Sequence, residues 1–303
     1  MFAGPPGGPP QFLVIGHAVQ DLLPEPDPAK PDVSPGWRLG GAAAYASVLA
    51  RNLGLRTALL TAAGPEMDLA AALPGIEIAI VPGESSTQFR NVYIGDRRSQ
   101  FIPQRAAPIT PAHLPAAWRQ ADIVLLGPVA GGVDPSLAAC FPDSLLGVGA
   151  QGWLREIAAD TSVRAVPPDA WDAEPVLRYA AALFLSDEDV PPHAAPAALQ
   201  RWGEMVETLA FTRGYNGADV LHRGEWRHID AFPADAVVDP TGAGDIFATG
   251  FLVRFRETGD PWEATRFGAC AASFVVEGQG ISAVPVRPQI EERLRRNPDI
   301  IAR

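Results

Sequence analysis

The chain has 303 residues, of which 47% are hydrophobic, and it carries a formal net charge of −11 at pH 7. This length and apolar content are sufficient for a substantial buried core, so we expect a soluble globular protein. The negative charge argues against nucleic acid or an anionic membrane as a partner, because binding to either depends on an excess of lysine and arginine.

The first residues, 1–11, are rich in glycine and proline and lack the basic and apolar segments of a signal peptide. We expect them to form a flexible extension before a single domain over 12–303. No apolar run is long enough to cross a bilayer, and the expected location is the cytoplasm. The two cysteines, Cys140 and Cys270, show no metal-binding spacing.

Short apolar strands alternate with amphipathic helices along the chain, which predicts an α/β fold with a mostly parallel sheet and helices on both faces. The predicted strands are 12–15, 57–62, 76–81, 122–126, 145–148, 183–185 and 208–211, with an antiparallel edge hairpin from 218–222 and 226–229. The predicted helices are 42–53, 153–159, 246–257, 262–277 and 289–296.

One stretch breaks this rhythm. Residues 87–94 and 99–102 alternate polar and apolar side chains around Gly95-Asp96, which predicts a hairpin outside the parallel layers. A surface hairpin without any function would show the same pattern.

A glycine-rich turn precedes the predicted helix at 246–257. The run Asp239-Pro240-Thr241-Gly242-Ala243-Gly244-Asp245 leaves backbone N–H groups free at a helix start, where the helix dipole favours an anion such as phosphate. An ordinary helix cap is the alternative, but it needs only one Ser, Thr or Asp. With an unperturbed pKa of about 3.9, Asp245 is expected to be ionised and able to accept a proton from an attacking hydroxyl. The segment therefore predicts phosphoryl transfer to an alcohol.

This run, together with Gly40-Gly41, closely resembles the two signatures of the ribokinase-like, or PfkB-type, carbohydrate kinases. The resemblance implies an ATP- and Mg²⁺-dependent kinase acting on a sugar or polyol. It implies a small β lid, built here from segments of about 17–38 and 83–105. It also implies that Gly242, Ala243 and Gly244 form an anion hole for the γ-phosphate and that Asp245 is the catalytic base.

The N-terminal half is expected to hold the acceptor. Asp21 follows the first strand as in the family's Gly-x-x-x-x-Asp, and the resemblance assigns it to sugar hydroxyls; a solvated loop residue is the alternative. Gly40 and Gly41 lack side chains and so let a ligand approach the backbone. Tyr45 stands where many members of the family have Asn, which leaves the preferred sugar open.

A second glycine pattern, Gly147-Val148-Gly149-Ala150-Gln151-Gly152, fits the Gly-x-Gly-x-x-Gly dinucleotide motif and precedes the predicted helix 153–159. Alone it would suggest an NAD-dependent oxidoreductase, but its glycines begin inside the strand. Instead, Gln151 and Arg155 are candidate substrate residues, in a neighbourhood similar to that of inositol-kinase-like members. A structural ion pair is the alternative for Arg155.

Further candidates follow from the resemblance. Ser186 and Asp189 replace the family's Asn-x-x-Glu, and Asp189 could reach Mg²⁺ through water. Asp239 and Thr241, with carbonyls from 277–282, stand where some members bind a monovalent cation such as K⁺. The nucleotide candidates are Thr212, Gly214 and Gly217, for which a plain turn is the alternative, and Gly280, in a loop expected near the ATP site.

The favoured function is therefore an ATP-dependent kinase of an inositol-like compound or a furanose or ketose sugar, acting as a monomer or homodimer. A nucleoside kinase of the same family and a non-catalytic nucleotide or sugar sensor are the alternatives. The acceptor itself depends on pocket shape, which the sequence alone does not specify.

Overall fold

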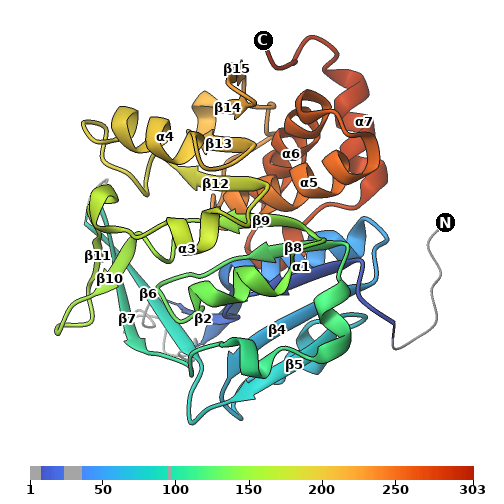
Figure 1. Cartoon of the computed structure of the whole chain (residues 1–303). Helices are drawn as coiled ribbons and strands as arrows, with labels where there is room; N and C mark the ends of the chain where they lie inside the picture. The colour runs from blue at the N-terminus through green and yellow to red at the C-terminus, as the bar shows by residue number, and fades with distance from the viewer. Residues whose placement is uncertain (1–7, 24–35, 95–96) are drawn as a thin grey trace, which may run out of the picture.

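The computed structural model describes residues 8–23, 36–94 and 97–303 (Figure 1). Within them, nine strands form a central sheet in the order β15-β14-β13-β12-β9-β8-β1-β4-β5. The two pairings among β13, β14 and β15 are antiparallel and the others are parallel. The strands are β1 (Phe12–Ile15), β4 (Thr57–Ala63), β5 (Glu77–Pro82), β8 (Ile123–Leu126), β9 (Leu145–Gly149), β12 (Ala182–Ser186), β13 (Thr208–Thr212), β14 (Ala218–His222) and β15 (Glu225–Ile229). Each predicted strand is confirmed within two residues.

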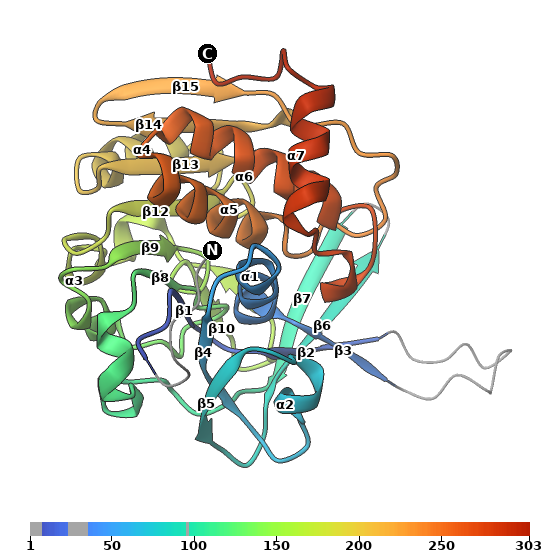
Figure 2. The same cartoon turned by 90° about the vertical axis from the view of Figure 1, so that its right-hand side faces the viewer.

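Helices cover both faces of this sheet. On one face lie α1 (Gly41–Asn52), α2 (Leu69–Ala72), α5 (Ala243–Thr258), α6 (Pro261–Val275) and α7 (Arg287–Arg296), as Figure 2 shows for the four longer ones. On the other lie α3 (Glu174–Leu177), α4 (Ala195–Gly203) and the 3₁₀ turns η1 (Pro111–His113), η2 (Ala116–Gln120) and η3 (Pro135–Cys140). Alternating residues of β1 enter the two cores, Phe12 and Val14 on one side and Leu13 and Ile15 on the other. The predicted α/β class is confirmed.

Helices α5 and α6 pack at backbone contact. A Cβ atom added at Gly268 would lie 2.7 Å from the carbonyl oxygen of Phe247, and one added at Gly250 would lie 3.1 Å from the Cα of Gly268. Only glycine lets the two helices approach this closely. The position of α5 on the sheet is therefore set by α6.

A second sheet of four strands, the lid sheet, stands beside the main layers (Figure 2). Its order is β3-β2-β6-β7, from β2 (Val19–Leu22), β3 (Trp37–Gly40), β6 (Thr87–Ile94) and β7 (Arg97–Gln104). The predicted hairpin is thus present as β6 and β7, although its tip at Gly95-Asp96 and the predicted lid residues 24–35 lie outside the described residues. Val19, Phe89 and Ile102 pack with Ala42 and Val129 into a small core beneath this sheet.

The predicted helix at 153–159 is wrong. Residues there form a turn and the short strand β10 (Arg155–Ile157), which pairs antiparallel with β11 (Val163–Ala165). The amide of Ile102 on β7 donates to the carbonyl of Thr161 at 2.8 Å, so the hairpin is also tied to the lid sheet. These long-range pairings override the local helical preference.

The dinucleotide interpretation also fails in the structure. Its glycine pattern opens no helix, so it provides no helix N-terminus for a pyrophosphate. Gly147 is instead required by packing, because a Cβ there would lie 2.5 Å from a methyl carbon of Leu252 on α5. Gly152 similarly leaves room for Pro128.

At the N-terminal end, residues 8–11 lie beside the N-terminal ends of β4 and β8. Gln11 accepts a hydrogen bond from the amide of Arg56 at 2.9 Å, and the amide of Asp122 donates to the carbonyl of Pro10 at 3.3 Å. The rest of the predicted flexible extension, 1–7, lies outside the described residues. None of the helices in the described part of the chain has the length and apolarity to span a bilayer.

We predict that Gly268→Ala lowers the free energy of unfolding by about 1–3 kcal/mol, because the new methyl group overpacks the contact between α5 and α6. Urea unfolding followed by circular dichroism measures the change. Gly149→Ala is the control, since a Cβ there meets its nearest atom, the carbonyl oxygen of Leu126, at 3.6 Å. Equal stability of both variants would contradict the close-contact interpretation.

Candidate active site

The glycine-rich turn forms the start of α5. Gly242 is the N-cap residue in the left-handed conformation, with φ of 84°, and no side chain caps the helix. The amide of Thr241 donates to Asp239 Oδ1 at 3.0 Å, and the amide of Ala243 donates to the carbonyl of Pro240 at 3.2 Å. Among the described residues, the amides of Gly242, Gly244 and Asp245 donate to no protein acceptor. These donors at a helix start are suited to bind an anion.

The two glycines of this turn have different surroundings. Gly244 is exposed, and an added Cβ would meet no atom within 4 Å. Gly242 instead lies on the ring of Tyr45, where an added Cβ would be 2.5 Å from Cγ and Cδ1. Gly242 is therefore required by packing as well as by its backbone conformation, whereas the protein gives no steric reason for glycine at 244.

Asp245 lies in the first turn of α5 and is partly buried. Loss of hydration, followed by the negative charge of Asp189, raises the pKa of Asp245 to about 7, while the positive charge of Arg155 opposes the rise. The expectation that Asp245 is fully ionised at neutral pH is thus wrong, because sequence reasoning could not include this desolvation. A carboxylate that titrates near 7 is well matched to general-base chemistry at neutral pH.

Arg155 and Asp189 form a buried ion pair, with 3.4 Å between Nη2 and Oδ1 and side chains 11% and 3% exposed. The other oxygen of Asp189 accepts hydrogen bonds from the amide and the hydroxyl of Ser186 at 2.9 and 2.8 Å. The ion pair given as the alternative for Arg155 is therefore present, and its role as a substrate residue stays a prediction. Gln151 lies in the turn before β10, where its carbonyl accepts a hydrogen bond from the amide of Leu154 at 3.2 Å.

The glycine pair marks the junction of the lid sheet and α1. A Cβ at Gly40 would overlap the Asp21 carboxylate, and Gly41, with φ of 84°, leaves no room for a Cβ beside the carbonyl of His17, which would lie at 2.6 Å. The missing side chain of Gly40 therefore makes room for Asp21, and the direct approach of a ligand to Gly40 stays a prediction.

Tyr45 lies between the acceptor candidate Asp21 and the glycine-rich turn that precedes α5. Its side chain is buried, and its pKa is raised well above the usual range by desolvation and by the carboxylates of Asp21, Asp239 and Asp245, against a smaller opposing effect of Arg38. The phenol therefore stays protonated. The acceptor candidate Asp21 and the candidate base Asp245 thus lie around one buried ring.

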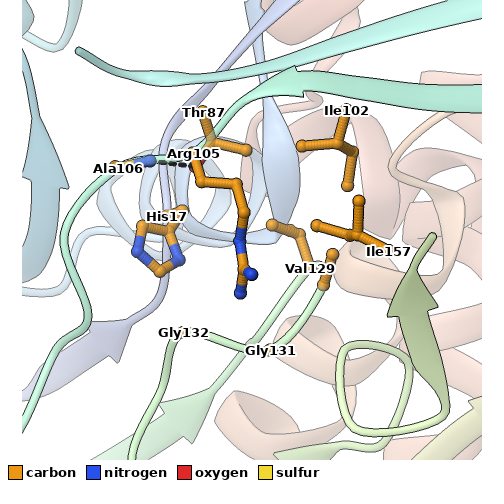
Figure 3. Close-up of a pocket in the computed structure, with 10 residues that line it drawn as sticks. His17, Thr87, Ile102, Arg105, Ala106, Val129, Gly131, Gly132 and Ile157 are labelled. Atoms are coloured by element: carbon orange, nitrogen blue, oxygen red, sulfur yellow. Dashed lines mark hydrogen bonds between the residues drawn. The ribbon is translucent and has the colours of Figure 1, made fainter. Parts of the chain in front are cut away.

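A pocket opens between the lid sheet and the loops that follow the sheet strands (Figure 3). It is lined by His17, Thr87, Ile102, Arg105, Ala106, Val129, Ala130, Gly131, Gly132 and Ile157. The expected lid segments, about 17–38 and 83–105, contain four of these residues, His17, Thr87, Ile102 and Arg105. The others are Ala106, Ile157 of β10 and the loop 129–132 after β8, where the Gly131-Gly132 pair is the one local signal in the sequence.

The nucleotide candidates lie at the end of β13 and in the C-terminal loop. Thr212 pairs with Ser186 across β12 and β13, which places it near Asp189. Gly214, with φ of 53°, has open space around it, and Gly280, with φ of 63°, begins η6 (Gly280–Ala283). A Cβ at Gly217 would overlap the carbonyl of Ile229, so that glycine is explained by hairpin packing.

The C-terminal loop lies beside the glycine-rich turn, because the amides of Val238 and Asp239 donate to the carbonyl of Val276 at 2.7 and 3.2 Å. This is the adjacency expected for the monovalent-cation candidates Asp239 and Thr241. Across the described ranges, no group of three or more His, Cys, Asp or Glu side chains is arranged to hold a metal ion.

Comparisons with known proteins decide the family. A model of the pfkB family of carbohydrate kinases matches residues 162–287. Inositol 3-kinase of Oryza sativa subsp. japonica is 30% identical over 287 residues, which cover 87% of this chain and 68% of that protein. The chain belongs to the pfkB carbohydrate kinase family.

Solved structures of other proteins share this fold. A fructokinase from Xylella fastidiosa with bound ATP superposes with a TM-score of 0.76 at 18% identity, covering 95% of this chain and 99% of that one. A pyrophosphate-dependent kinase of the ribokinase family, in complex with a pyrophosphate analogue and myo-inositol, gives 0.75 at 20% identity, over 93% and 99% of the two chains. As a pfkB-family kinase, this protein transfers a phosphoryl group to a hydroxyl.

We predict that Gly242→Ala lowers stability by at least about 1–2 kcal/mol, since it places a side chain in the left-handed region against Tyr45. Gly244→Ala should leave stability unchanged or raise it by up to about 1 kcal/mol, because alanine favours a helix. Thermal and urea unfolding of the two variants measure the difference. A similar loss in both would contradict the assignment of distinct surroundings to the two glycines.

Proposed function

We propose that the chain transfers the terminal phosphoryl group of ATP to a hydroxyl of a small sugar or polyol, with Asp245 as the general base. One observation carries this proposal. A carboxylate with a pKa of about 7 stands at the start of α5, next to backbone amides that have no acceptor among the described residues. The amides can stabilise the charge of a transferring phosphoryl group while the carboxylate takes the proton of the attacking hydroxyl.

The donor side rests on the open surroundings of Gly244, Gly214 and Gly280. Gly242, Ala243 and Gly244 would hold the γ-phosphate, and Thr212, Gly214 and Gly280 would lie along the nucleotide. Gly217 has a packing role that explains it without a nucleotide. One structural relative uses pyrophosphate and another holds ATP, so both donors belong in the assay.

The acceptor side rests on Asp21, which lies against Gly40 at the base of the lid sheet. Its carboxylate can accept hydrogen bonds from two hydroxyls, which suits a vicinal diol. The names of the relatives, inositol 3-kinase and fructokinase, support an inositol-like or ketose acceptor. Closure of the lid sheet over this acceptor would exclude water and limit hydrolysis of the donor.

The residues near Asp245 fit Mg²⁺ only through water. Asp189 already accepts hydrogen bonds from Ser186 and Arg155, so neither of its oxygens is without a donor. Mg²⁺ keeps several waters and is carried by substrate phosphates, whose charge it would neutralise. Asp239 and Thr241 remain the candidates for binding K⁺, because they lie beside the C-terminal loop. Replacing K⁺ with a large organic cation in the assay buffer tests whether the enzyme requires K⁺.

We predict that Asp245→Asn lowers kcat by at least about 100-fold with little change in donor binding, because the amide cannot take the proton. ADP or phosphate release is measured with ATP or pyrophosphate and a panel of sugars, polyols and nucleosides. Donor binding is followed by calorimetry. Full turnover by the variant would overturn the base assignment. Turnover only with nucleosides would favour the nucleoside kinase. Donor binding without product from any acceptor would favour the sensor.

We also predict a pH dependence. Since Asp245 must be ionised to act as a base and titrates near 7, kcat/KM should rise with pH through about 7. Asp189→Asn removes the charge that raises this pKa, so the rise should move to lower pH, whereas Arg155→Gln should move it to higher pH. Because the raised pKa makes ionised Asp245 destabilising, the stability gained by Asp245→Asn should grow between its ordinary pKa of 3.8 and its raised pKa of about 7. Identical pH profiles for all three enzymes would contradict this coupling.

A further inference from the structure

The pocket beneath the lid sheet carries one formal charge, and it is positive. Its ten lining residues include Arg105 but no aspartate or glutamate. His17 also lines it, but burial and the nearby Arg105 lower the pKa of His17, so its ring is neutral and donates from Nε2 to the carbonyl of Ala107 at 3.0 Å. The charge of this pocket is thus opposite in sign to the net charge of the chain, which is −11.

The guanidinium of Arg105 points into this pocket, toward Gly131 and beside His17 (Figure 3). A Cβ added at Gly131 would be 3.5 Å from its Nη2. In the part of the chain that the structure describes, the Arg105 side chain makes no ion pair and no hydrogen bond, unlike the paired arginines Arg155, Arg287 and Arg293. The cation is therefore available to a ligand.

The backbone around Arg105 is held in place. The carbonyl of Arg105 accepts a hydrogen bond from the hydroxyl of Ser85 at 3.4 Å, and the amide of Ala106 donates to Thr87 Oγ1 at 3.1 Å. The amide of Ile109 donates to the carbonyl of Gly132 at 2.7 Å, which fixes this segment over the glycine pair. The guanidinium thus extends from an ordered support, which lowers the entropy lost when it binds a ligand.

Strand β10 links the pocket to the surroundings of the candidate base. Strand β10 carries Arg155, whose charge acts on Asp245, and Ile157, which lines the pocket. Residues two apart on a strand share a face and lie about 6–7 Å apart. The pocket that holds Arg105 therefore borders the same short strand as the charge that acts on Asp245.

We infer that the acceptor carries an anionic group, a carboxylate or a phosphate, which Arg105 binds. The acceptor class is then a sugar acid or a sugar phosphate rather than a neutral sugar. This inference rests on the proposed function, because it names the acceptor of the same site. A guanidinium can bind either group through two parallel hydrogen bonds, and the apolar side chains of Ile102, Val129 and Ile157 line another part of the pocket.

The test compares matched acceptors. Gluconate and glucuronate supply a carboxylate, fructose 6-phosphate supplies a phosphate, and glucose, fructose and myo-inositol are neutral. We expect an acidic acceptor to have the highest kcat/KM. Arg105→Met should lower that value by about 10- to 100-fold, mainly through KM, with a much smaller change for neutral acceptors. Arg105→Lys should restore part of the loss. Arg119→Met, at an exposed arginine of η2 outside the pocket lining, is the control and should change nothing.

The outcomes separate this inference from the proposed function. If a neutral acceptor is preferred and Arg105→Met leaves all acceptors unaffected, the anionic acceptor is wrong while the kinase stands. If no acceptor yields product, the proposed function is at fault, and calorimetry still decides the inference. Binding of an acid to wild type that Arg105→Met weakens at least 10-fold supports it, and equal or absent binding to both proteins overturns it.

Discussion

The contact between Gly242 and the ring of Tyr45 is the constraint on which the site depends. Tyr45 belongs to α1, which begins at Gly41 beside Asp21, and Gly242 begins α5, which carries Asp245. Since no side chain fits between the turn and the ring, the two helix starts have a fixed separation. The candidate phosphate site and the candidate acceptor site are thereby joined through a single aromatic side chain.

This arrangement concentrates negative charge around a buried group. Asp21, Asp239 and Asp245 all act on Tyr45, and Asp189 acts on Asp245. Arg38 and Arg155 offset part of this charge, Arg155 by an ion pair with Asp189 in the interior. The site can therefore hold a carboxylate with a pKa of about 7, because opposite charges limit a shift that desolvation alone would make larger.

Much of the fold could be predicted from local sequence, because parallel strands buried on both faces read as short apolar runs between amphipathic helices. The start of α5 could be located for a similar reason, since its glycines and acid are contiguous. The β10–β11 hairpin could not, because its pairing with β7 joins residues about 60 positions apart, Ile102 and Thr161. The same limit applies to Arg105 and to the pair of Arg155 with Asp189, which only the folded chain brings to the site.

The glycines were harder to interpret than their motifs suggest. Gly40, Gly147 and Gly217 lie in motifs associated with ligands, yet each is required by a neighbouring side chain or carbonyl of the protein. Gly244 is the glycine of the turn before α5 that leaves open space. A glycine in a motif thus indicates that another group comes close to the backbone at that position. Only the structure shows whether that group belongs to the protein or is left to a ligand.

The meeting of α5 and α6 at Gly250 and Gly268 has a consequence for altering this enzyme. Those two positions lie within one helix pair, outside the pocket lining, and they set how closely α5, whose first turn carries Asp245, packs on α6. Libraries that seek new acceptors can vary the pocket freely, but enlarging either glycine would shift the carboxylate itself. Such variants would lose turnover for every acceptor alike, without any change in selectivity.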